Sequence, residues 1–413
     1  MNNAIFVIKY LFLFLGVYSL TSCKQGVRHS VDPWDETLSP AQNIARNAIY
    51  MDNNDDFSFL DVILKEKQCV FLGEGSHWDL ETIETKSKMI AYFGRSGYSL
   101  AMEGMAFLSS YVFSEPKFYN TVQTWKMDKF MPLISYDFEE FQPIKEMIRS
   151  HQIKLLGIET HVGYYDVDAA KIILDQYAKI DYFPMNWDRL NTLFRTKFVK
   201  NHLLSVEENF ELMDMIDSIS NYVHYLIFAI NKDDLDLKAI LQWIRNVNTD
   251  FSFRKYFTTT EIEKIELALR NRDIQMAENM IWYLDHFPNE KCVVSCANFH
   301  ESKDISQTRY QDKNPLLYYI FQSMGEGVYH RLGDKMYSLA FSNCIQIKEG
   351  HLEWEIAQKS NAPYAFVDFE SLRYADGYRN QSFGATMIGP KRGKWLNIFD
   401  GLYYIRDERR PKK

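Results

Sequence analysis

A series of short apolar runs constrains the fold of this chain more strongly than any other feature. They cover Cys69 to Leu72, Tyr98 to Met102, Lys154 to Ile158, Lys291 to Cys296, Met336 to Phe341, Ala365 to Phe369 and Leu402 to Ile405. Most of these runs are nearly continuous, which is typical of strands whose two faces are both covered by helices. The pattern therefore predicts an α/β fold with a mixed, largely parallel sheet and helices on both faces.

Long amphipathic stretches fill residues 165–288, where no convincing strand pattern occurs. We interpret this region as a helical insertion within one domain that spans residues 46–413. Thr260 and Glu263 resemble a capping box, so the last helix of the insertion is expected to run from Thr260 to His286. That helix leads directly into one of the expected strands.

The N-terminus has the character of an export signal. The apolar run from Tyr10 to Leu20 is too short to span a bilayer, and Leu20-Thr21-Ser22-Cys23 resembles a bacterial lipobox. We therefore expect a signal peptide over residues 1–22, lipidation of Cys23 and a tether that continues to residue 45. The protein would then be exported and anchored by lipid to a membrane of the cell envelope. An ordinary cleaved signal with an incidental cysteine is the alternative.

Two local patterns complete the framework. Ser39 and Pro40 are a good N-cap and first helical residue, so a helix is expected from there through Ile49. The remaining cysteines lie in or beside apolar runs and are interpreted as small buried hydrophobes; they are Cys69, Cys292, Cys296 and Cys344. Their spacing gives no indication of a zinc site.

The charge distribution argues against a nucleic-acid partner. The chain has 47 basic and 55 acidic residues, a formal net charge of -8, and no long block of like charge. Aromatic residues make up 15% of the chain, and most of these rings are expected to fill the core. The expected partners are a small molecule and, through the lipid, a membrane.

Ionisable residues follow several of the apolar runs directly. They are Glu74, His77, Glu103, Glu159, His161 and His300. Ligands of open α/β sheets bind at the carboxyl ends of the strands, so these side chains are expected to share one crevice if the strands are neighbours. A neutral histidine beside a carboxylate can take a proton from water, which makes His77 the candidate base. The glycines on each side of Glu74 are expected to permit a tight turn and close approach of a ligand.

Other reaction motifs are absent from the sequence. It contains no G-x-S-x-G elbow, Walker loop or H-E-x-x-H motif, which argues against a serine nucleophile, a phosphate cradle and a metalloprotease site. Zinc held by His77, His161 and His300 remains open as an alternative.

Two blocks of sequence resemble the erythromycin esterase family. The first block is Phe71-Leu72-Gly73-Glu74-Gly75-Ser76-His77, followed by Leu100-Ala101-Met102-Glu103-Gly104. The second is Asn271-Arg272-Asp273 in a helix, followed by Val293-Val294 and Ala297-Asn298-Phe299-His300. Weaker similarity extends the match to about residues 46–405. The resemblance implies hydrolysis of a macrolide lactone by an activated water, without a metal or other cofactor, and antibiotic resistance would be its consequence.

Carried over to this chain, the resemblance makes His77 the general base and Glu74 its carboxylate partner. Glu103 and His300 complete the acid/base and orienting set, and Arg272 stabilises negative charge on the ester oxygen. The residues expected to bind substrate are Lys86, Asn298, Glu159, His161 and Trp78. On a helical wheel alone, the stripe that contains Arg272 indicates a solvent face. Only the resemblance moves that stripe into the site.

The sequence also departs from the family pattern at four positions. Ala297 stands where family members commonly have a histidine, and Lys86 stands where they often have arginine. Glu159 replaces the aspartate of a Gly-x-Asp element, and Trp78 replaces a small residue. Lysine lacks the forked donor geometry of arginine, so the substrate can be a macrolide or another ester or lactone.

The leading hypothesis is therefore a metal-independent ester or lactone hydrolase. The alternative is a surface lipoprotein that has lost catalysis and holds a small ligand, a metal or haem through the same histidines. A stoichiometric metal in the purified protein would favour the second hypothesis over the first. The sequence does not indicate an oligomeric state.

Overall fold

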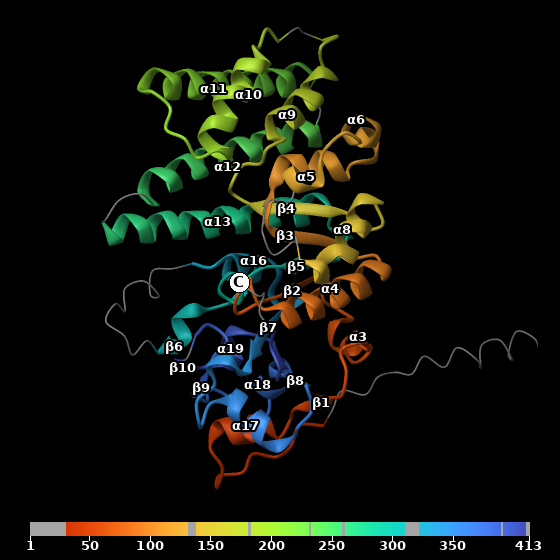
Figure 1. Cartoon of the computed structure of the whole chain (residues 1–413), viewed down its shortest axis with the longest axis vertical. Coiled ribbons are helices and arrows are strands. Elements are labelled where there is room, and N and C mark those ends of the chain that lie inside the picture. The colour runs from red at the N-terminus through yellow and green to blue at the C-terminus, as the bar shows by residue number, and fades with distance from the viewer. Residues whose placement is uncertain are drawn as a thin grey trace, which may run out of the picture.

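The apolar runs of the sequence form one eight-stranded sheet at the centre of the molecule (Figure 1). In spatial order the strands are β1 (Ile49–Met51), β8 (Tyr364–Asp368), β11 (Gly401–Ile405), β7 (Met336–Asn343), β2 (Cys69–Leu72), β5 (Cys292–Ser295), β3 (Ser99–Ala106) and β4 (Leu155–Glu159). From β11 to β4 all neighbours are parallel, whereas β8 is antiparallel to β1 and β11. The predicted α/β class with a mixed, largely parallel sheet is confirmed.

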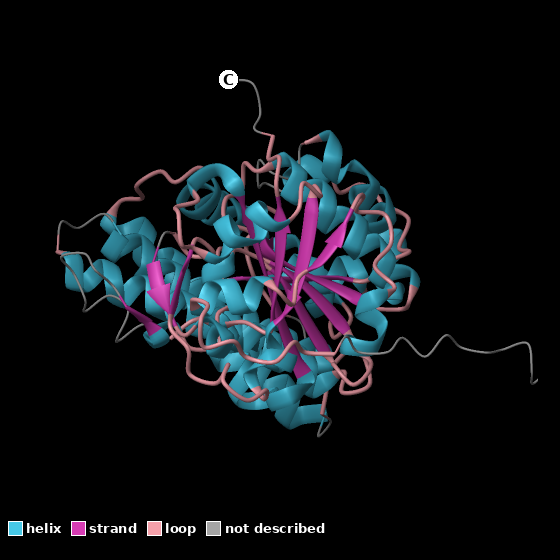
Figure 2. Cartoon of the chain, turned by 90° about the horizontal axis from the view of Figure 1, so that it is seen from below, coloured by secondary structure: helices cyan, strands magenta, loops and turns pink. Residues whose placement is uncertain are grey.

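Consecutive residues of the central strands point into two different apolar cores. In β2, Val70 and Leu72 belong to one core, whereas Cys69 and Phe71 belong to the other. The first core includes side chains of α4 (Leu80–Arg95), α5 (Phe107–Ser114) and α8 (Gln142–Arg149), and the second includes those of α13 (Ile262–His286) and α16 (Met324–Leu332). Helices therefore cover both faces of the sheet, as Figure 2 shows, which explains why the runs lack polar alternation.

The computed structural model describes residues 30–130, 138–180, 183–230, 233–257, 261–309, 322–389 and 391–409. The expected signal peptide and Cys23 lie outside these residues. Within the described parts of the chain, no helix has the length and apolar character needed to cross a membrane.

Helices alone fill the described part of the chain between β4 and β5. They are α9 (Asp166–Asp175), α10 (Trp187–Phe194), the π-helical turn η4 (Arg195–Val199), α11 (Val206–Ile230), α12 (Leu235–Phe257) and α13. In Figure 1, α10, α11 and α12 lie together at one end of the molecule, and α13 runs beside the sheet. Because α13 packs against α12, α16 and β4, it joins these helices to the sheet. Its N-cap is Glu261, without a side-chain cap, and the expected cap Thr260 lies outside the described residues.

The helix expected at Ser39 begins as predicted but is shorter. The Ser39 hydroxyl accepts a hydrogen bond from the backbone N–H of Gln42, the side-chain oxygen of Gln42 accepts one from the backbone N–H of Ser39, and α2 covers Pro40–Ala45. The expectation that it continues to Ile49 was wrong, because Ile49 opens β1 and pairs with Phe366 of β8. Sheet pairing here overrides a local helical pattern.

A second, three-stranded antiparallel sheet was not predicted. It is formed by β6 (Thr308–Arg309), β10 (Lys391–Gly393) and β9 (Phe383–Ala385), whose runs are too short to show an apolar pattern. The remaining α-helices of the described residues are α3 (Phe59–Leu64), α6 (Tyr119–Val122), α7 (Met127–Phe130), α14 (Asn298–Glu301), α17 (Leu352–Lys359), α18 (Phe369–Arg373) and α19 (Trp395–Ile398).

Candidate active site at the strand ends

The structure brings the expected site residues to the carboxyl edge of four neighbouring parallel strands. Glu74 lies just after β2, Glu159 is the last residue of β4, and His300 lies in α14, just after β5. Glu103 differs from the expectation because it lies inside β3, which continues beyond it. A register shift and the positive φ of Gly104, 77°, mark a bulge at this point.

His77 and Lys86 hold the two carboxylate oxygens of Glu74. Nδ1 of His77 bonds to Oε1, and Nζ of Lys86, on α4, lies 2.6 Å from Oε2. Glu74 and Lys86 are buried, whereas the side chain of His77 is 42% exposed. Among the described residues, no group bonds Nε2 of His77. This nitrogen is therefore open to water or a ligand.

Proton affinities in this group follow from its ion pairs. The hydrogen bond to Glu74 raises the pKa of His77 more than burial lowers it. Burial opposes ionisation of Glu74, but Lys86 and His77 outweigh it and lower the pKa of that carboxyl. Glu74 is thus an anion that favours the protonated form of His77.

The glycine before Glu74 is needed for packing within the protein. A Cβ on Gly73 would lie 1.9 Å from Oδ1 of Asn298 and 2.4 Å from Oε1 of Glu301. A Cβ on Gly75 would meet nothing within 4 Å. The close approach expected at these glycines is therefore made at Gly73 by two buried side chains of α14, not by a ligand.

Arg272, on α13, lies at the centre of a buried cluster. Its Nε and Nη2 lie 2.9 and 2.5 Å from the two carboxylate oxygens of Glu159, and Nη2 lies 3.2 Å from Oε1 of Glu103. Burial opposes the ionisation of Glu159, but Arg272 and His161 lower its pKa to about 2. Nη1 of Arg272 contacts neither carboxylate and lies 3.3 Å from Nε2 of His300.

His300 is enclosed between two acids. Its Nδ1 lies 3.0 Å from Oδ2 of Asp273, and its Nε2 lies 3.1 Å from Oε1 of Glu103. Burial favours the neutral ring, but Asp273 and Glu103 outweigh it and raise the pKa of His300 to about 10. Burial likewise opposes a charge on Glu103, yet His300 and Arg272 lower its pKa well below the usual range. His300 is therefore cationic at neutral pH, which does not suit it to act as a general base there.

The helical insertion supplies a second histidine–carboxylate pair. Nδ1 of His161 lies 2.8 Å from Oδ1 of Asp250, which is fully buried on α12. Asp250 also accepts hydrogen bonds from the backbone of Val162 and from Arg254. Burial lowers the pKa of His161, but Glu159 and Asp250 outweigh it and raise it. With 37% of its side chain exposed, His161 lies at the edge of the Arg272 cluster.

Asn298 differs from its expected role in substrate binding. Its amide nitrogen donates to the backbone oxygens of Phe341 and Met387, at 2.6 and 2.7 Å, and its oxygen accepts from the backbone of Phe341. Both donors are thus used within the protein, and Asn298 joins α14 to β7. Trp78 is 47% exposed and packs edge-on against Phe138, so it stays available to a ligand.

Two acidic partners of the candidate site histidines, Asp250 and Asp273, were not predicted from the sequence. Asp273 follows Arg272 directly, so the motif Asn271-Arg272-Asp273 carried a signal that a second acid might accompany the arginine. Asp250 carried no such signal, because its contact with His161 depends on how α12 packs against the neighbouring helices α13, α5 and α9. The backbone nitrogen of Ala297 also donates to Oε2 of Glu103, at 2.9 Å.

The arrangement at His77 suits proton transfer from water. Within the described parts of the chain, no group of three or more His, Cys, Asp or Glu side chains is arranged to hold a metal ion. His77, His161 and His300 do not share such a site; each pairs with a different acid. This edge of the sheet therefore carries two features. One is the half-exposed imidazole of His77 with an open nitrogen, and the other is the buried cluster around Arg272 with fixed positive and negative charges.

Solved structures of other proteins resemble this chain in fold. A Bacillus cereus protein shares 16% identity with it at a TM-score of 0.69, over 91% of this chain and 98% of that chain. A succinoglycan biosynthesis protein shares 14% identity at a TM-score of 0.63, over 91% and 98%. A mutant erythromycin esterase in its open conformation also shares 14% identity at a TM-score of 0.63, over 87% and 95%.

No protein-family profile matches the sequence, and no curated protein does. At these low identities the structural likeness shows a shared fold. The relationship to an erythromycin esterase is therefore a distant relationship of fold.

Proposed function

We propose that this protein is a hydrolase that adds water to an ester or lactone at the His77 site. The observation that carries the proposal is the His77–Glu74 pair, in which Nδ1 is held by a carboxylate and Nε2 has no partner among the described residues. A carboxylate in this position fixes the tautomer of the ring and stabilises the imidazolium formed during proton transfer. The fold shared with an erythromycin esterase supports the same reaction class.

In the proposed mechanism, Nε2 of neutral His77 removes a proton from water as the water oxygen attacks the carbonyl carbon. The bond to the alcohol oxygen then breaks, and the imidazolium returns its proton to that oxygen. Acid and alcohol are the products, and the enzyme is regenerated. Lys86 keeps Glu74 ionised through this cycle, since it lies 2.6 Å from the oxygen that His77 does not use.

The buried cluster is proposed to stabilise the negative charge that develops on the carbonyl oxygen. Arg272 and His300 are cations held in place by Glu103, Glu159 and Asp273. Nη1 of Arg272 is the part of the guanidinium that contacts no carboxylate, so it is the proposed donor. Such fixed donors act without reorganisation when charge develops in the transition state.

The proposed substrates include both macrolides and other esters or lactones. Trp78 and Phe138 present aromatic surface beside the His77 turn, which suits an apolar or macrocyclic ester. Ala297 offers no side-chain donor or acceptor. A macrolide is thus one candidate among esters and lactones.

The test is hydrolysis of a macrolide and of a panel of smaller lactones and esters, followed by mass spectrometry. Wild-type protein is expected to add one water to at least one panel member, and His77→Ala is expected to lose this activity while staying folded. His330→Ala is the matched control, because His330 is an exposed residue of α16. Failure of wild type to turn over any member, or equal turnover by His77→Ala, would contradict the proposal.

We also propose that the chain is exported and anchored through a lipid on Cys23, as its lipobox-like segment indicates. Expression in a bacterium fed labelled palmitate should label the protein and place it in the membrane fraction. Cys23→Ala should remove the label, whereas Cys344→Ala should retain it. An unlabelled wild-type protein would leave Cys23 as an incidental cysteine.

A further inference from the structure

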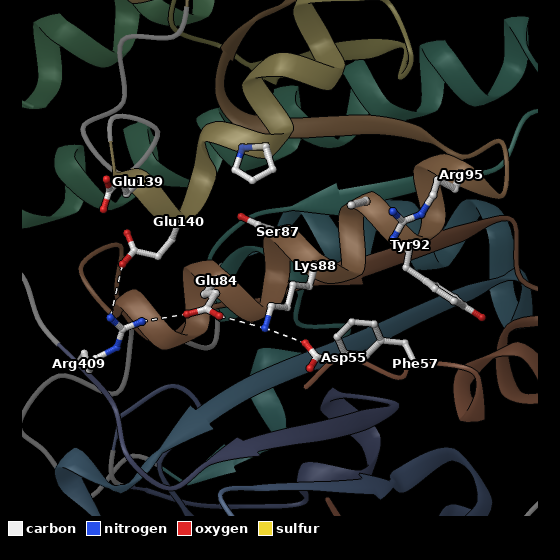
Figure 3. A pocket seen from close by; sticks show the side chains of 12 residues that line it. Asp55, Phe57, Glu84, Ser87, Lys88, Tyr92, Arg95, Glu139, Glu140 and Arg409 are labelled. Atoms are coloured by element: carbon white, nitrogen blue, oxygen red, sulfur yellow. Dashed lines mark hydrogen bonds and ion pairs between the residues drawn. The ribbon is translucent and has the colours of Figure 1, made fainter. Parts of the chain in front are cut away.

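A pocket beside α4 is lined by charged side chains that form ion pairs with one another (Figure 3). Lys88 pairs with Asp55 and Glu84, and Arg409 pairs with Glu84 and Glu140. Exposed pairs of this kind contribute little to stability, and by themselves they do not indicate a ligand. A feature that the proposed reaction leaves unexplained lies instead in the apolar core, where two thiols meet.

Cys69 and Cys292 bring these thiols together at the centre of the sheet. They are the first residues of β2 and β5, which are parallel neighbours, and they are direct partners in the strand register. Their sulfur atoms lie 3.3 Å apart, although the two residues are 223 positions apart in the chain. Both residues are fully buried. The fold therefore places two groups that can be oxidised to a disulfide in direct contact.

The backbone at this position suits a disulfide. Neighbouring strands lie about 4.8 Å apart, which falls within the range of about 4.4–6.8 Å between the Cα atoms of disulfide-bonded cysteines. Both side chains point to the same face of the sheet, into the core that contains Phe71 and Met280. The sulfur atoms have to approach by about 1.3 Å, from 3.3 Å to a bond length of about 2.0 Å. This is a displacement of side-chain atoms, and the strand pairing can stay intact.

The other cysteines of the described residues lie too far away to replace either partner. Cys296 is four residues beyond Cys292, so an extended backbone carries it beyond the span of a disulfide. Cys344 follows the carboxyl end of β7, whereas Cys69 pairs with Met336 at the start of that strand. Within the described chain, the fold therefore selects one pair of cysteines.

Closure of this pair is an oxidation, and its oxidant is another disulfide. One cysteine thiolate attacks the oxidant and releases a thiol, and the second thiolate displaces the remaining thiol from the mixed disulfide. The protein loses two protons and two electrons, and the oxidant is reduced to two thiols. Burial and the neighbouring Cys292 raise the pKa of the Cys69 thiol well above its usual range, and the thiolate is the form that reacts. The bond therefore has to form before β2 and β5 are buried.

We propose that Cys69 and Cys292 form a disulfide when the chain folds under oxidising conditions. The bond links β2 to β5, the strands that precede Glu74 and His300, and it closes a loop that contains β3, β4 and the helices between β4 and β5. A loop of this length restricts the unfolded chain, so the bond stabilises the fold. The export proposed from the segment at Cys23 would supply oxidising conditions. The bond itself depends neither on export nor on hydrolysis.

The experiment unfolds the reduced full chain in urea and refolds it in a buffer of reduced and oxidised glutathione. The product is then unfolded, treated with iodoacetamide without reductant, digested and analysed by mass spectrometry. We expect the Cys69 and Cys292 peptides to be joined, with a mass two hydrogen atoms below the sum of the free peptides, while Cys296 and Cys344 are alkylated. Reduction should free both thiols and lower the urea midpoint of unfolding by about 1 M.

Matched variants assign the bond to its two residues. Cys23→Ala and Cys344→Ala should keep the cross-link, whereas Cys69→Ala should lose it and leave Cys292 alkylated. The comparison of oxidised with reduced wild type needs no variant, so it tests the proposal even if Cys69→Ala fails to fold. Free thiols at both positions after oxidative refolding, or a cross-link to Cys296 in place of this pair, would overturn the proposal.

Discussion

His77 and His300 lie at the same edge of the sheet, yet their surroundings make them different chemical groups. His77 uses one ring nitrogen for Glu74 and keeps the other open, with a side chain 42% exposed. His300 is buried, and Asp273 and Glu103 take both of its nitrogens. Both rings have a raised pKa, and the two acids around His300 raise its pKa to about 10.

Both residues are histidines, so the difference lies in their surroundings. The number of acidic partners decides which of the two rings can exchange protons. One carboxylate orients the ring of His77 and raises its pKa, while the second ring nitrogen stays open to exchange a proton with water or a ligand. Two buried carboxylates keep the ring charged. We therefore assign proton transfer to His77 and fixed positive charge to His300 with Arg272.

The largest expected effect separates the two histidines by activity. His77→Gln should lower kcat/KM about 10²–10⁴-fold, the usual contribution of a general base, while the free energy of unfolding changes by less than about 1 kcal/mol because His77 is half-exposed. Steady-state kinetics and urea unfolding on the same preparation measure both quantities. Full activity in His77→Gln would remove His77 from the mechanism.

A change in the buried cluster should lower the free energy of unfolding. Arg272→Met removes the cation that holds Glu159 and Glu103, and breaking a buried ion pair from one side costs about 3–5 kcal/mol. Arg331→Met is the matched control, because Arg331 pairs with Asp285 on the surface and such pairs are worth at most about 1 kcal/mol. Equal losses in urea unfolding for the two variants would show that the cluster is not a buried ionic centre.

A smaller effect concerns the dependence of stability on pH. The pKa of His300 rises from 6.5 to about 10 on folding, so its stabilising contribution is complete below about pH 6.5. It declines as pH rises through this interval and is absent above about pH 10. His300→Gln should lack this decline in the free energy of unfolding. A wild-type curve that runs parallel to that of His300→Gln between pH 7 and pH 10 would contradict the assignment.

The smallest expected effect is a shift in the pH profile. Lys86 lowers the pKa of His77, so Lys86→Met should raise that pKa and move the alkaline rise of kcat/KM upward, by less than about one pH unit. Lys88→Met is the control, since Lys88 is on the same helix but pairs with Asp55 and Glu84. A shift to lower pH in Lys86→Met would reverse the assigned effect of this lysine.

The central strands could be predicted because each apolar run is buried by helices on both faces. The edge strand β1 could not, since Ile49 follows a well-capped helical start and only its pairing with Phe366 makes it a strand. The charged residues after β2, β4 and β5 could be expected to lie together from the rule for parallel sheets. The contact of His161 with Asp250 depends on how α12 packs, which local sequence does not encode, whereas Asp273 was indicated only by its place beside Arg272 in the motif.

The position of Arg272 illustrates the same limit. A helical wheel gave its stripe of α13 to solvent, because that stripe is polar. In the structure, Gln275 and Asn279 of that stripe are buried, and Asn279 donates to the backbone oxygen of Ile158 in β4. A polar stripe can thus face a sheet when the sheet edge supplies partners, and the sequence of the helix alone does not show this.

The most direct test of this account is an NMR titration of the histidine rings in the intact protein, with His77→Gln and His300→Gln to assign the signals. We predict that His77 titrates with a pKa above 6.5, and that His300 stays protonated to about pH 10. Titration of His300 near neutral pH, or a His77 ring that stays charged to the same pH as His300, would contradict the division between an exchanging histidine and a fixed cation.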